Sequence, residues 1–153
     1  AGGDLEDMFK YPGFIDGDLA DFPETSNPSV EGGGYTTISD YGKILLMHLR
    51  GGSCAQGRAL SRAAVERMQE DRIAEAYQGS TGEPAMPGYG LGWWLSRDEP
   101  GVMCDPGAYG AIPWIDLERG YGVMIILEAE VEHGASIMQN VKPVVEGIFD
   151  AAE

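Results

Sequence analysis

Residues 88–128 decide the fold of this chain: GYGLGWWLSRDEPGVMCDPGAYGAIPWIDLERGYGVMIILE. The stretch is rich in aromatic and β-branched residues, which favour strands, and glycine, aspartate and proline turn signals divide it into short segments. Consecutive short strands joined by tight turns pair with their neighbours in opposite directions. We therefore predict an antiparallel sheet over residues 89–129.

Two helices are predicted upstream of this sheet. The first begins after Thr37, because Thr37 or Ser39 can cap it and apolar residues then recur at helical spacing until Arg50. The second begins after Ser61 and directs Val65 inward. Both helices therefore carry an apolar face that needs a partner.

A third helix is predicted near the C-terminal end, from about residue 132 to 152. Its apolar residues form one stripe that can lie on a sheet, while Pro143 inside the pattern predicts a kink or a restart near Asn140. Residues 72–87 lose this periodicity and gather glycine and proline, which predicts a loop. Together these segments predict the α+β class, an antiparallel sheet with flanking helices.

The N-terminal part differs from the rest in composition. Residues 1–36 carry Pro12, Pro23 and Pro28 among scattered glycine and aspartate, and predict an irregular N-terminal arm. Residues 37–153 hold all the periodic segments. The 153 residues, 43% of them hydrophobic, are enough for one domain core.

The order of the short motifs resembles a known family. GYGLGWW (88–94) precedes DPGAYG (105–110), WID (114–116) and GYG (120–122), and GGGYTTISDYGK (32–43) and LSRAAVERM (60–68) lie upstream. In this order they resemble the C-terminal part of the serine β-lactamase-like family, which includes class C β-lactamases, related esterases and penicillin-binding peptidases. The resemblance implies that residues 37–153 are the C-terminal part of a β-lactamase-like α/β domain.

The nucleophile of that family has no counterpart in this sequence. Its enzymes use a serine activated by a lysine in Ser-x-x-Lys, with a Tyr-x-Asn or Ser-x-Asn element nearby. Neither motif occurs here: the residues three positions before Lys10, Lys43 and Lys142 are Asp7, Asp40 and Gln139. We therefore expect the chain to be the C-terminal part of a serine hydrolase, inactive alone. The alternative is a self-contained, non-catalytic binding or assembly module.

The resemblance also implies which residues border the active site. Asp105, Pro106 and Gly107 stand where the family has a Lys-Thr-Gly or His-x-Gly triplet on the edge strand of its site. By position, Gly107 allows close approach of a substrate and the Ala108 backbone N–H faces the oxyanion. Asp105 replaces a basic or neutral residue, which disfavours penicillin-like carboxylates and favours other small ester, amide or peptide substrates. The alternative is that these residues form a simple turn.

Other residues with reactive side chains are expected to be structural. Cys54 follows a predicted helix end and Cys104 lies in a predicted strand, where a small buried thiol is common; one disulfide between them stays open. His48 is placed on a helix face and His133 at the surface. Alternation along a strand puts the adjacent Trp93 and Trp94 on opposite faces, with core packing as the expectation.

Charge and composition exclude several classes of function. The net charge of −15 opposes nucleic-acid binding, because phosphate contacts need clustered lysine and arginine. No segment reaches the roughly 20 apolar residues of a membrane span, no targeting segment is recognisable in the sequence, and no motif for a metal or cofactor is present. The compartment is therefore left open. Expected partners are an N-terminal half that carries the nucleophile, or a second copy of the chain, as a dimer or with a swapped arm.

Overall fold

The computed structural model describes residues 36–76 and 79–151, all within one unit of the chain, Thr36–Glu153. The predicted irregular arm over residues 1–36 lies outside this description except for Thr36. That prediction, and the domain boundary that goes with it, remain predictions.

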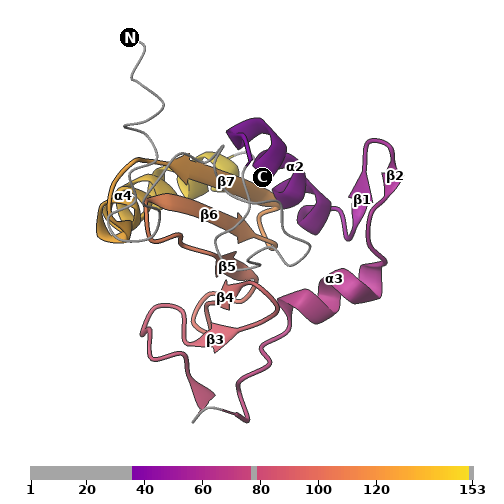
Figure 1. The fold of residues 1–153 in the computed structure, drawn as a ribbon, viewed down its shortest axis with the longest axis horizontal. Coiled ribbons are helices and arrows are strands. Elements are labelled where there is room, and N and C mark those ends of the chain that lie inside the picture. Colours follow the sequence, from indigo (N-terminus) through magenta and orange to yellow (C-terminus); the bar gives the residue numbers. More distant parts are fainter. Residues whose placement is uncertain (1–35, 77–78, 152–153) are drawn as a thin grey trace, which may run out of the picture. The chain divides into compact units, whose positions relative to one another are not determined.

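Five strands form an antiparallel sheet in the order β3-β4-β5-β6-β7 (Figure 1). Spatial order and chain order coincide, so the predicted meander is confirmed. The longest pairing joins β6 to β7, with a register from Ala111↔Ile126 to Asp116↔Tyr121. The strands are β3 (Gly88–Tyr89), β4 (Trp94–Leu95), β5 (Val102–Cys104), β6 (Ala111–Asp116) and β7 (Tyr121–Ile126).

Helices α2 (Ile38–Leu49) and α4 (Val131–Asp150) pack on opposite faces of the sheet. Because side chains alternate along a strand, neighbouring residues of β5 and β6 enter different cores. The core under α2 contains Leu45, Trp93, Leu95, Met103 and Ile115. The core under α4 contains Cys104, Trp114 and Tyr121, with Met138, Val141 and Val145 packed against it.

The upstream helices begin where their caps predicted. The Thr37 hydroxyl accepts from the Asp40 N–H at 3.1 Å, so Thr37 rather than Ser39 caps α2. The Ser61 hydroxyl accepts from the Ala64 N–H at 3.1 Å and caps α3 (Arg62–Gln69). A side-chain acceptor at this position satisfies an N–H group that has no partner within the helix. Local sequence therefore determines both helix starts.

A short hairpin between α2 and α3 was not predicted. It consists of β1 (Ser53–Cys54) and β2 (Gly57–Arg58). Gly51 and Gly52 precede it with φ angles of 55° and 93°, a region that side chains rarely adopt. The chain thus leaves α2 through two left-handed residues, and the hairpin is too short to show strand periodicity.

Helix α4 runs without interruption through Pro143. Of the two alternatives predicted near Asn140, the restart is therefore wrong and the kink stays a prediction. A proline removes one helical hydrogen bond and crowds the preceding turn, but apolar side chains on both sides of it, Met138 and Val145, pack into the same core. Tertiary packing thus holds the two halves of α4 in one helix.

Candidate active site

The segment that follows β5 forms an open strand edge. The Asp105 N–H donates to the Pro113 carbonyl at 3.3 Å and the Gly107 N–H donates to the Ala111 carbonyl at 2.7 Å, so pairing with β6 continues past the end of β5. On the other side, β4 ends its pairing with β5 at Trp94↔Cys104. Strand β5 itself is therefore interior, while residues 105–107 are paired on one side only among the described residues.

Ala108 begins the turn that follows this segment. The N–H groups of Asp105 and Gly107 face β6, and Pro106 between them has no N–H to donate. Ala108 belongs to the turn, where the alternation of N–H groups along a strand no longer applies. Its predicted role as the oxyanion donor remains a prediction.

The turn that carries Ala108 rests on the start of α4. The Gly110 N–H donates to the Gly107 carbonyl at 3.1 Å, which closes a tight turn. The Ala108 carbonyl accepts from the Val131 N–H at 3.0 Å, and the Tyr109 carbonyl from the Ala129 N–H at 3.3 Å. The carbonyl groups of the turn are thus held at the start of α4.

Two glycines allow this close contact. Gly110 has a φ of 91°, and a Cβ there would lie 3.0 Å from the Leu127 carbonyl oxygen. A Cβ at Gly134 of α4 would lie 2.7 Å from the Ile112 side chain. Our sequence interpretation missed Gly134 as a support of the site. The signal was a glycine inside a helix, where it costs about 1 kcal/mol relative to alanine.

Gly107 has a structural neighbour as well as a position at the open edge. A Cβ built on it would lie 3.3 Å from the Ala111 carbonyl oxygen, across the turn. The absence of a side chain at this position is therefore explained in part by β6. Its predicted role in admitting a substrate remains a prediction.

Asp105 lies half-buried on the α2 side of the sheet. It follows Met103 at strand spacing, and Met103 packs in the core under α2. Burial raises the pKa of the Asp105 carboxyl. Burial, together with the charge of Asp105, raises the pKa of Tyr41 on α2 to about 12. Asp105 and Tyr41 therefore interact electrostatically at one side of the open edge.

The cysteines are not suited to act as nucleophiles in place of a serine. Both are free thiols, so the disulfide left open by the sequence is absent. Cys104 is buried, and burial with the charges of Asp105 and Glu83 raises its pKa to about 12. A thiol becomes nucleophilic as the thiolate. Cys104 is thus the buried strand thiol that the sequence predicted, while Cys54 lies half-buried in β1.

The histidines and tryptophans also lie where the sequence predicted. His48 is 3% exposed on α2, and His133 is exposed on α4. Trp93 lies in the core under α2, whereas Trp94 packs against the core under α4. His48, Trp93 and Trp94 are therefore placed by packing, while His133 lies at the surface in the first turn of α4.

In the described ranges, 36–76 and 79–151, no three His, Cys, Asp or Glu side chains lie close enough to hold a metal ion. None of the helices there combines the length and the apolar run that a membrane crossing requires. The candidate site of this part of the chain therefore consists of backbone groups and one carboxylate.

Comparison with known proteins identifies the family. The model of the Beta-lactamase family matches residues 8–140, which is most of the chain. The chain belongs to the Beta-lactamase family. The search of curated proteins found no match.

A solved structure shares the fold. The crystal structure of a "putative beta-lactamase from Bacteroides dorei DSM 17855" aligns with a TM-score of 0.58 at 23% sequence identity. The alignment covers 82% of this chain and 46% of that one. The chain thus spans under half the length of the solved structure that it resembles. Family and α+β fold both agree with the resemblance seen in the sequence.

Proposed function

We propose that this chain is the C-terminal part of a serine hydrolase of the β-lactamase family, of esterase, amidase or peptidase type. The observation that carries the proposal is the open edge at residues 105–107, which leads directly to the Ala108 N–H, the proposed oxyanion donor. Backbone N–H groups aimed at a developing oxyanion stabilise the tetrahedral intermediate of acyl transfer. The chain supplies this donor, and a serine from another part of the enzyme attacks the substrate.

The nucleophile must come from a part of the enzyme other than residues 1–153. None of the lysines in this range is preceded by serine at the Ser-x-x-Lys spacing, and Cys104 is buried with a raised pKa. Without an activated nucleophile no acyl-enzyme can form. The open edge is therefore one half of a catalytic site.

Asp105 sets the charge of the substrates. A carboxylate beside the oxyanion donor repels an anionic substrate, and no lysine or arginine among the described residues pairs with it to cancel that charge. Neutral or cationic esters and amides are therefore the expected substrates. In the complete enzyme, Asp105→Asn should raise kcat/KM for a carboxylate-bearing ester relative to a neutral ester of the same length.

Activity assays test the proposal directly. The isolated chain should hydrolyse neither nitrocefin nor p-nitrophenyl butyrate, and activity should appear when a polypeptide carrying the Ser-x-x-Lys motif of the same enzyme is added. Ala108→Pro removes the proposed donor N–H and should lower kcat by about 10²- to 10³-fold, the usual effect of losing one oxyanion donor. Ala108→Gly keeps the N–H and is the matched control. Turnover by the isolated chain, or full activity of Ala108→Pro in the assembled enzyme, would contradict the proposal.

The nucleophile-bearing polypeptide has a suitable surface to bind. Among the described residues strand β7 is the last of the sheet, and its sequence YGVMII carries no charge. An uncharged edge strand can pair with another strand. On α4 the side chains of Ile137, Val144 and Ile148 are 39%, 64% and 65% exposed and recur at helical spacing. An uncharged edge and an apolar helix stripe fit a partner that contributes a strand and an amphipathic helix.

Charge favours that partner over a second copy of the chain. Exposed Glu128, Glu130 and Glu132 lie at one end of α4, and Asp150, which pairs with Arg119, lies at the other. In a two-fold dimer with antiparallel α4 helices the three glutamates would face a carboxylate and an arginine that already pair with each other, whereas a partner with basic flanks would complement the glutamates.

Light scattering can separate the two outcomes. The isolated chain should be monomeric and should form a one-to-one complex with the nucleophile-bearing polypeptide. Ile148→Glu should weaken that complex at least tenfold, while Leu91→Glu, a 47% exposed residue away from α4, should not. A concentration-dependent dimer that Ile148→Glu dissolves would show that a second copy occupies the surface instead.

A further inference from the structure

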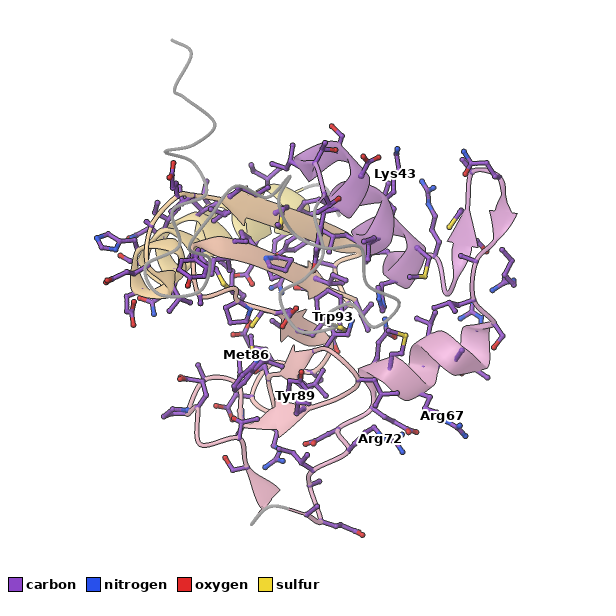
Figure 2. All side chains as sticks on the ribbon, viewed as in Figure 1. Lys43, Arg67, Arg72, Met86, Tyr89 and Trp93 are labelled. Carbon is purple, nitrogen blue, oxygen red and sulfur yellow. The ribbon has the colours of Figure 1, made fainter. Side chains whose placement is uncertain are left out.

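His48 joins three elements that are separate in the sequence. It lies on α2, its Nε2 is 3.3 Å from the indole Nε1 of Trp93 before β4, and its Nδ1 is 3.4 Å from the Gln69 amide at the end of α3. The His48 and Trp93 rings also meet edge to face, with centroids 5.0 Å apart. Figure 2 places Trp93 near the start of β4. Both ring nitrogens of His48 are therefore occupied inside the fold.

These contacts determine which nitrogen carries the proton. An indole N–H can only donate, so Nε2 of His48 must be an unprotonated acceptor and the neutral ring carries its proton on Nδ1. The Gln69 Nε2 lies 3.4 Å from Nδ1, and we assign the flipped amide orientation, in which the Gln69 oxygen accepts that proton. If Nε2 were protonated, its N–H would face the indole N–H of Trp93, and neither group could accept. The contacts of His48 with Trp93 and Gln69 therefore require a neutral histidine.

Charged side chains around His48 are bonded elsewhere. On α3, Arg62 lies 4.0 Å from Glu66; beyond α3, Asp71 pairs with Arg97 at 2.8 Å. Arg58 of β2 donates to backbone carbonyl groups, and the Arg67 side chain points away from the sheet (Figure 2). Within α2, Asp40 pairs with Lys43. The pKa of His48 is lowered by burial alone, with no charged partner to offset it.

Helix α3 is held to the rest of the fold by a small set of contacts. Its buried side chain is Val65, at 1% exposure. The Met68 carbonyl accepts from the Leu91 N–H at 2.9 Å, and Gln69 contacts His48. Elements with few buried contacts open more readily than the core of a domain. Loss of the His48 contact should therefore open α3 before it opens other elements of the fold.

We propose that His48 is an acid-sensitive latch that holds α3 against α2 and β4 while neutral and releases α3 when protonated. The released state exposes the His48 ring to water, where it can carry its charge. Helix α3, with the hairpin before it and the loop after it, is the part of the fold that responds.

The direction of the pH effect follows from linkage. The pKa of His48 is below the ordinary value of about 6.5 in the closed state and returns toward it when the ring is exposed. Contacts that require neutral His48 are therefore fully present above pH 6.5 and are lost as pH falls toward the closed-state pKa. Over that interval the opening equilibrium should rise by up to about tenfold per pH unit.

Hydrogen exchange of the chain at pH 7, 6 and 5 tests the latch. Protection factors corrected for the intrinsic pH dependence should fall in α3 below pH 6.5, by up to about tenfold per unit, while those in β6 and β7 stay constant. The His48→Gln variant should remove the dependence, because an amide can accept from Trp93 and donate to Gln69 without titrating. His133→Gln, which changes the other histidine of the chain, should leave the dependence intact.

The proton NMR titration of the two histidines gives a second measurement that does not depend on a variant. His48 should titrate below the ordinary histidine pKa of about 6.5. An ordinary His48 titration near pH 6.5, constant protection of α3 between pH 7 and 5, or a uniform loss of protection across the sheet would overturn the latch. Loss of the pH dependence in His133→Gln rather than His48→Gln would do so too.

Discussion

The two ends of β6 show how the same residue type is used in opposite ways. At one end of β6 the Asp116 side chain is 1% exposed. Its carboxylate accepts from the N–H groups of Glu118 and Arg119 and from the Arg119 guanidinium, at 2.9 to 3.0 Å. Near the other end, Asp105 of the neighbouring segment bonds the Pro113 carbonyl through its N–H; its side chain is half-buried, and burial raises the pKa of its carboxyl. No side chain in the described part of the chain forms an ion pair with it.

The difference separates a structural end from an available one. Arg119 also reaches α4, where it contacts Glu146 at 3.8 Å and Asp150 at 2.7 Å, so the turn between β6 and β7 is tied to the last turn of the helix. At the opposite end, the start of α4 binds the carbonyl groups of the 107–110 turn. The Asp116 end thus has a carboxylate bonded to several donors, while the Asp105 carboxylate near the other end has no ion pair among the described residues.

The largest predicted effect is the loss of Asp116. Asp116→Ala removes the acceptor of the Glu118 and Arg119 N–H groups and one of the carboxylates that pair with the Arg119 guanidinium, and hydrogen bonds to a charged group contribute about 1.5–3 kcal/mol each. Urea unfolding monitored by tryptophan fluorescence measures this loss. Asp105→Ala is the matched change at the other end and should alter the free energy of unfolding by about 1 kcal/mol or less. Equal losses of unfolding free energy for Asp116→Ala and Asp105→Ala would contradict the difference between the two ends of β6.

Glycine substitutions in α4 should give the next largest effect. Gly134→Ala brings a Cβ within 2.7 Å of Ile112, and such overpacking costs about 1–3 kcal/mol. Gly147 has no atom within 4 Å of the equivalent position, so Gly147→Ala should stabilise the helix by about 0.5–1 kcal/mol. Thermal unfolding of the two variants gives the comparison. A stabilised Gly134→Ala would mean that α4 does not press on the 107–110 turn.

The smallest predicted effect concerns the pH dependence of stability at Asp105. Because the folded-state pKa of this acid is raised, its ionised form destabilises the fold, and that penalty is present above the folded pKa and relieved as pH falls through it. Asp105→Asn should therefore be more stable than the parent at pH 7 by up to about 1 kcal/mol, and the difference should shrink as pH falls toward 4. A stability difference between Asp105→Asn and the parent that grows as pH falls would contradict a raised pKa for Asp105.

Much of the fold could be predicted because its signals are local. Thr37 and Ser61 cap helices through bonds to residues three positions ahead, and the strands of the meander are adjacent in the chain. The motif order around residues 105–110 also pointed to the family. In a meander the register between two neighbouring strands is set by the short turn that joins them, so few alternative strand pairings are possible.

The sequence by itself thus determined the helix starts, the meander and the family, together with the absence of a Ser-x-x-Lys motif. Only the tertiary structure decided that β4 stops pairing at Cys104 and leaves residues 105–107 open, that Gly134 lets α4 reach the turn, and that His48 meets Trp93 and Gln69. Each of these depends on residues that belong to different elements, and their contacts follow from packing helices on one sheet. Helical period and strand alternation reveal which face of an element is apolar, but not which residue of another element it meets.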